Sequence, residues 1–177
     1  LINIQAQLYE RTAQYAQAAA TYTRLRQLKP QSLEVARHLA LNYYNAGVVY
    51  AKQASTESGK EARQAKQVAS DYFTQAANVL SEVLYNDPLA INYAYALANA
   101  YAYVGDTERL QAITAKIQAL GYSSTTIGGS DMQLMDFNAA SKRPNLVAAA
   151  PAPTGQSSVQ NTFKAPAPVA QTATAPK

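Results

Sequence analysis

Apolar residues recur at helical spacing through residues 1–122. The first stripe predicts a helix over residues 2–12, whose inner face carries Ile2, Ala6, Tyr9 and Ala13. A second stripe predicts a partner helix over residues 15–28. Pro30 ends that helix, because proline has no N–H to donate and its ring clashes with the preceding turn. Together the two stripes predict an antiparallel helix hairpin.

The next pair of stripes predicts a longer hairpin. Ser32 is a suitable N-cap, and apolar and small residues then keep helical spacing up to a polar break at Ser55–Lys60. The return helix, residues 62–84, ends before Pro88. This hairpin has 24 residues more than the first, so each helix gains about 12 residues and an arm of about 18 Å is expected. Gly47 falls inside the first of its helices.

A third hairpin is predicted over residues 89–120. Gly105 and Asp106 mark its turn, and Asp106 can cap the helix that follows. The second helix of this hairpin departs from the earlier pattern, because Leu110 and Thr114 stand where the first hairpin has Ala18 and Tyr22. Terminal repeats are often atypical, since one of their faces meets solvent.

The chemistry of the chain changes after residue 122. Residues 123–143 combine a polar, glycine-containing linker with a short apolar cluster, Met132–Phe137. Two interpretations of this cluster stay open: a cap on the last helix, or a short linear motif for a partner. Residues 144–177 are mainly Pro, Ala, Thr, Gln and Ser, which cannot bury enough apolar area to offset their ordering entropy. We therefore expect a helical domain (1–122), a linker and capping region (123–143) and a disordered tail (144–177).

One short motif, Ala-x-x-Tyr, recurs in register in the first helix of each hairpin. Its copies begin at Ala6, Ala40 and Ala98, so the first two are 34 residues apart and the next two 58, which is 34 plus the 24-residue insertion. Pro30 and Pro88 keep the same spacing of 58. A period near 34 residues indicates helix pairs that bury their apolar faces only by stacking on one another. That architecture favours binding over catalysis.

These residues resemble the tetratricopeptide repeat family. The match lies in the small residue and tyrosine of the first helix, the turn glycine, the alanine and large residue of the second helix, and the closing proline. It covers residues 1–122, although Gln5 stands where the family prefers leucine and the usual tryptophan is missing. The resemblance implies an all-α, right-handed α-solenoid of three helix-hairpin repeats. It also implies a concave groove lined by the first helix of each hairpin, protein or peptide ligands, and no enzymatic activity.

The same resemblance implies which residues line the groove. It places there the partner-binding candidates Asn3, Gln7, Arg37, Leu41, Tyr44, Asn45, Asn92, Tyr95, Asn99 and Tyr103. This surface would suit an extended peptide whose backbone is held by amide side chains and whose side chains pack on tyrosines. Some family members grip a C-terminal carboxylate with basic groove residues. The corresponding positions here carry no lysine or arginine, so we expect no carboxylate clamp; they are Asn3, Gln7, His38, Asn92 and Ala96.

Composition narrows the chemistry further. The chain has no cysteine, which excludes disulfides and cysteine-ligated metal sites within it. His38 is the sole histidine, and with Glu34 one turn away it does not make a metal site, so we expect a surface histidine and no metal, cofactor or catalytic set. The net charge of +4 comes from scattered bases, so no nucleic-acid partner is expected. No apolar run reaches the roughly 20 residues that a membrane span requires.

We therefore expect a non-enzymatic protein–protein interaction scaffold that binds a protein or peptide partner in its groove. The alternative is a self-assembling structural subunit, a homo-oligomer or filament built by head-to-tail stacking, because both ends of such an array expose helix faces. The chain starts inside a repeat, which suggests that it is cut from a longer protein. Low charge, abundant Ala, Gln, Asn and Tyr, and the Pro/Ala tail favour a bacterial cell-envelope or secreted location, in the periplasm or at the cell surface.

Overall fold

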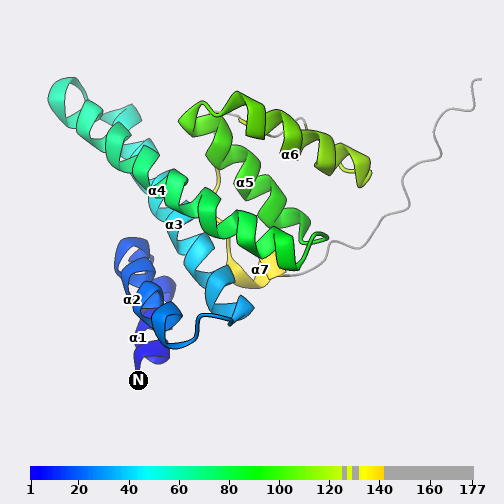
Figure 1. Cartoon of the computed structure of the whole chain (residues 1–177). Coiled ribbons are helices and arrows are strands. Elements are labelled where there is room, and N and C mark those ends of the chain that lie inside the picture. The colour runs from blue at the N-terminus through cyan, green and yellow to red at the C-terminus, as the bar shows by residue number, and fades with distance from the viewer. Residues whose placement is uncertain (125–126, 129–131, 142–177) are drawn as a thin grey trace, which may run out of the picture. The chain divides into compact units, whose positions relative to one another are not determined.

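Helices account for most of the residues that the structure describes. The computed structural model describes residues 1–124, 127–128 and 132–141. Within these ranges six helices follow one another, and a short seventh comes after them (Figure 1). They are α1 (Ile2–Arg11), α2 (Tyr15–Leu28), α3 (Leu33–Thr56), α4 (Gly59–Asn86), α5 (Ile91–Val104), α6 (Thr107–Ala119) and α7 (Phe137–Ser141). The expected all-α class is confirmed for these residues, and the expected tail, 144–177, lies outside them.

The six longer helices pack in chain order. Each contacts its neighbour in sequence, from α1 on α2 to α5 on α6. Their bounds agree with the predicted ones to within a few residues, and the predicted caps are present. The Ser32 hydroxyl accepts a hydrogen bond from the Val35 N–H at 3.3 Å, and the Asp106 carboxylate accepts one from the Arg109 N–H at 3.1 Å. Both side chains satisfy a backbone donor that a helix start otherwise leaves free.

The hairpin of α3 and α4 is the extended one that the insertion predicts. Its helices have 24 and 28 residues, and their far ends project beyond the other helices (Figure 1). Gly47 lets the two helices approach closely, because a Cβ at this position would lie 3.0 Å from three carbons of the Phe73 ring. Further along the arm, the rings of Tyr50 and Tyr72 stack with centroids 5.6 Å apart. Small residues near the base and aromatic pairs beyond it thus hold the arm together.

Two clusters of buried apolar side chains form the core. The smaller cluster joins α1, α2 and α3 through Ala6, Ala18, Ala19, Tyr22, Leu25, Val35 and Leu39. The larger cluster extends through α3, α4, α5 and α6. Tyr43 and Val79 pack against both clusters and so connect them. Many members of both clusters are alanines with almost no exposed surface, which allows the helix backbones to approach one another closely.

Two tyrosines of the repeated motif have matching surroundings. The Tyr43 hydroxyl lies 2.9 Å from Thr23 Oγ1, which is on α2. The Tyr101 hydroxyl lies 3.2 Å from Ser81 Oγ, which is on α4. In both cases the tyrosine on the first helix of a hairpin meets a hydroxyl on the second helix of the hairpin before it, 20 residues earlier in the chain. The 58-residue register of the sequence therefore appears again in these contacts.

Candidate functional site

The chain's own residues lie along the helix faces that were expected to form a groove. Residues 132–140, which we call the docked segment, run past α3 and α5 and end in α7. Met132, Met135 and Phe137 pack against the larger core cluster. The expected cap on the last helix is thus replaced by docking on α3 and α5. Nothing in the local sequence pattern distinguished these two placements.

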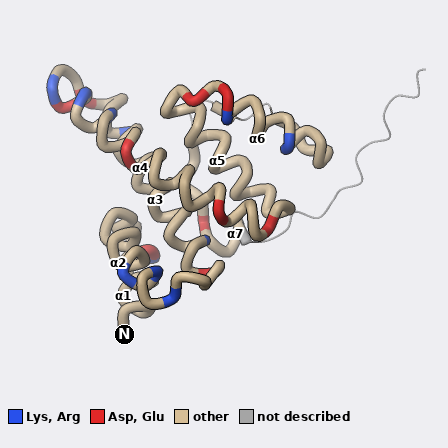
Figure 2. Tube along the Cα trace, in the orientation of Figure 1, with Lys and Arg blue, Asp and Glu red and all other residues tan. Residues whose placement is uncertain are grey.

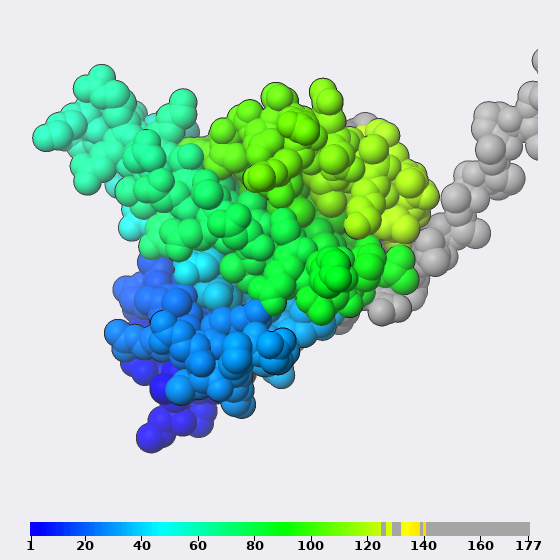
Figure 3. Space-filling view, in the orientation of Figure 1, coloured from blue at the N-terminus to red at the C-terminus, as the bar shows by residue number. Residues whose placement is uncertain are grey.

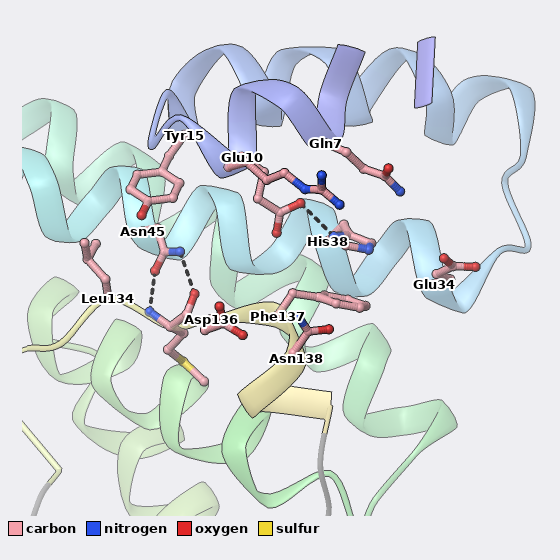
Figure 4. Close-up of a pocket in the computed structure, with 12 residues that line it drawn as sticks. Gln7, Glu10, Tyr15, Glu34, His38, Asn45, Leu134, Asp136, Phe137 and Asn138 are labelled. Carbon is pink, nitrogen blue, oxygen red and sulfur yellow. Dashed lines mark hydrogen bonds and ion pairs between the residues drawn. The ribbon is translucent and has the colours of Figure 1, made fainter. Parts of the chain in front are cut away.

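Asn45 holds the centre of the docked segment. Its side chain is 3 % exposed. Asn45 Nδ2 donates to the carbonyl oxygen of Met135 at 2.8 Å, and the Met135 N–H donates to Asn45 Oδ1 at 2.8 Å (Figure 4). One amide side chain therefore satisfies both backbone groups of one residue. This contact depends on an extended backbone and not on the identity of the side chain it holds.

Three more of the predicted groove residues also bind backbone atoms. Asn92 Nδ2 donates to the carbonyl oxygen of Ala140 at 3.4 Å. Asn99 Oδ1 accepts from the Gly128 N–H at 2.9 Å, and the Tyr95 hydroxyl donates to the carbonyl oxygen of Ser123. Four side chains of α3 and α5 thus hold backbone groups between residues 123 and 140. All four come from the set that the sequence placed in the groove.

An aromatic stack holds the C-terminal part of the docked segment. The Phe137 ring lies on the His38 ring with centroids 3.5 Å apart and planes at 9°, and Tyr22 stacks near the opposite side of His38 at 5.0 Å and 9°. His38 is only 8 % exposed, so the expected surface histidine is wrong. Its burial comes from α2 and Phe137, which a helical pattern within α3 cannot show.

Glu10 connects this stack to α1. Its Oε2 atom lies 2.9 Å from His38 Nδ1 and accepts a hydrogen bond from the Tyr22 hydroxyl at 3.0 Å (Figure 4 shows the pair with His38). Burial raises the pKa of the Tyr22 phenol well above its ordinary value, and the nearby Glu10 carboxylate raises it further. One carboxylate therefore orients two of the three stacked rings.

A cavity of about 610 Å³ remains between α1, α3 and the docked segment. Gln7 and Arg11 line it from α1, Glu34 from α3 and Asp136 from the docked segment (Figure 4). A second cavity, of about 400 Å³, lies where the arm meets α5 and is lined by Asn99, Tyr103 and Met132 among others. Burial raises the pKa of Tyr103. The docked segment therefore leaves unfilled space on either side of the position held by Asn45.

Three predicted groove residues have other surroundings. Leu41 and Tyr44 are each 1 % exposed and belong to the larger core cluster, where the Tyr44 ring meets Phe73 edge-on at 5.6 Å. Arg37 Nη2 pairs with Asp87 Oδ2 at 2.6 Å, which joins α3 to the connection between α4 and α5. Asn3 is exposed at the start of α1. The sequence marked the right helices but could not tell which of their side chains face α4.

The walls of this site carry little charge. Figure 2 shows Lys and Arg on α2, near the tip of the arm and on α6, and α5 has no charged residue. Among the described residues, no three of His, Cys, Asp or Glu gather closely enough to hold a metal ion. No helix within these ranges is long and apolar enough to cross a membrane. Comparisons with protein-family models, curated proteins and solved structures found no match to this chain.

Proposed function

We propose that the protein is a non-enzymatic interaction scaffold that binds an extended peptide segment of a partner along α1, α3 and α5. The observation that carries this proposal is the pairing of the Asn45 amide with both backbone groups of Met135. A side chain placed in this way recognises an extended backbone, which is the common element of peptide ligands. The docked segment then acts as an internal ligand that displays the mode of recognition.

The proposal includes a repeat architecture of the tetratricopeptide type, three hairpins stacked as a right-handed solenoid. Its support is the recurrence of one contact between successive hairpins, Tyr43 with Thr23 and Tyr101 with Ser81. The packing of the helices in chain order agrees with it. In such an array the first helices of the hairpins share one concave face, and those helices carry the amides that hold the docked segment.

The surroundings of the docked segment indicate the chemistry of a partner peptide. A backbone in extended conformation would pair with Asn45, and an aromatic side chain two residues further on would stack on His38, as Phe137 does. The cavity beside α1 combines Glu10, Glu34 and Asp136 with Arg11, so it offers room for a polar or basic side chain. A partner with these features would compete with the docked segment for the same groups.

A peptide of residues 131–141 added in trans tests this proposal. The groove is first vacated by replacing residues 132–138 of the full chain with glycine and serine, and binding of the labelled peptide is followed by fluorescence anisotropy. We expect saturable binding that Asn45→Ala, in the same background, weakens about tenfold because two hydrogen bonds are lost. Asn78→Ala, at an exposed asparagine of α4, is the matched control and should leave the affinity unchanged.

Circular dichroism of each variant shows whether the helices are intact. Absence of saturable binding to the vacated, folded protein would contradict the proposal. Equal affinity of the Asn45→Ala and Asn78→Ala proteins would contradict it as well, because the amide contact would then not be what holds the peptide.

A further inference from the structure

α1 has an apolar face that no described residue covers. Ile4 is 69 % exposed and Leu8 is 59 % exposed, and Ile2 beside them is 37 % exposed. These side chains lie about one helical turn apart, so they form one stripe. The N-terminal hairpin stands at one end of the packed helices, with α6 at the other end (Figures 1 and 3). The stripe therefore faces away from the rest of the described unit.

The equivalent faces of the other two hairpins are covered. Moving 34 residues along the chain converts Ile4 and Leu8 into His38 and Asn42, which are 8 % and 0 % exposed. His38 there contacts Glu10 of α1 and Tyr22 of α2, the two helices of the preceding hairpin. In α5 the equivalent positions are Ala96 and Ala100, both at 0 %. A hairpin packed on this face is thus what covers it wherever the chain repeats.

We infer that the exposed stripe of α1 binds a helix hairpin that is not part of residues 1–177. This inference rests on the proposed repeat architecture. The second helix of that hairpin would present a small residue followed four positions later by a hydroxyl, as Ala19 and Thr23 do for α3 and as Ala77 and Ser81 do for α5. Tyr9, the motif tyrosine of α1, would meet that hydroxyl.

A second copy of this chain does not offer such a helix. Its α2 and α4 already use these residues against α3 and α5. At the equivalent positions α6 carries Gln111, Ala115 and Gln118, all of them exposed, so it lacks both the hydroxyl and the apolar neighbours. The C-terminal end of the array is therefore polar where the N-terminal end is apolar, which does not favour head-to-tail stacking.

A fusion provides a hairpin of the required kind in register. A second copy of residues 1–34 is placed directly before Leu1 of the full chain, and hydrogen exchange of the α1 amides is measured. We expect exchange in α1 to slow about tenfold or more relative to the unfused chain, because packing suppresses local opening. Leu8→Asp in the original α1 should abolish this protection, and Asn3→Asp, at a polar position of the same helix, should preserve it.

A third fusion carries Ile4→His and Leu8→Asn, so that α1 presents the residues that α3 presents to α2. Protection of α1 in this variant but not in the native-sequence fusion would overturn the inference, since the native stripe would then not accept such a hairpin. Absence of protection in both would overturn it through the repeat register. Sedimentation of the unfused chain completes the test: a dimer that Leu8→Asp dissociates would assign the stripe to a second copy. Peptide binding at Asn45 is measured separately, so failure here does not depend on the proposed function.

Discussion

Gly47 lies in the middle of α3, where glycine is a poor helix former. Replacement of a helical glycine by alanine ordinarily stabilises a helix by about 1 kcal/mol. Here the added Cβ would lie 3.0 Å from the Phe73 ring. That ring has little freedom to move, because Tyr44 and Tyr103 pack against it with centroids 5.6 Å and 4.6 Å away. The steric cost is therefore expected to exceed the gain in helix propensity.

We predict that Gly47→Ala lowers the free energy of unfolding by about 1–3 kcal/mol, the usual cost of overpacking a core. Urea denaturation followed by circular dichroism measures this change. Phe73→Leu in the same chain makes room for the Cβ, so Gly47→Ala should cost less in that background than in the wild type. Equal costs in the two backgrounds would show that the ring is not what excludes a side chain at residue 47.

The residues that the sequence placed correctly are those whose partners are near in the chain or follow the repeat. Asn45 was expected to hold an extended backbone, and it does so. His38 and Tyr44 were expected at the surface and are buried, because Phe137 covers one and Phe73 packs against the other. Those contacts join residues far apart in sequence, and hydrophobic periodicity within one helix carries no information about them.

The helices α3 and α4 begin with the same residue type in two different states. Ser32 caps α3 through its hydroxyl, whereas the Ser58 hydroxyl makes no capping hydrogen bond to α4. We predict that Ser32→Ala lowers the free energy of unfolding by about 1 kcal/mol because a backbone N–H loses its acceptor. Ser58→Ala, at the exposed tip of the arm, should change it little. Thermal and urea unfolding of the two variants compare these costs, and equal costs would mean that the Ser32 cap does not contribute.

At the scale of elements, the sequence predicted the helices well and the docked segment poorly. The six helices have strong apolar stripes, and proline, glycine and capping residues mark their ends, so local rules were sufficient. The docked segment has no regular period between residues 123 and 136, and hydrogen bonds to Asn45, Asn92 and Asn99 hold it in place. Such contacts follow from the assembled helices and not from the segment itself.

Buried tyrosines make the stability of the whole molecule sensitive to alkaline pH. Burial raises the pKa of six phenols above their ordinary value of 10.0: Tyr15, Tyr22, Tyr44, Tyr72, Tyr95 and Tyr103. Above about pH 10 the unfolded chain therefore releases protons that the folded chain retains. Since the unfolded state then binds fewer protons, the free energy of unfolding falls as the pH rises. Below the ordinary pKa both states are protonated, and these groups contribute no pH dependence.

We predict that the free energy of unfolding declines steeply above about pH 10, with each tyrosine that ionises only in the unfolded state contributing a slope of up to about 1.4 kcal/mol per pH unit. Tyr22→Phe should reduce this slope by up to that amount, while lowering stability at neutral pH through loss of the hydrogen bond to Glu10. Tyr85→Phe removes an exposed tyrosine and is the matched control. Urea unfolding at several pH values between 8 and about 11 measures the slopes. Equal slopes for the two variants would contradict the assignment of the alkaline response to buried phenols, because the Tyr22 hydroxyl is held between the α1 carboxylate and the core.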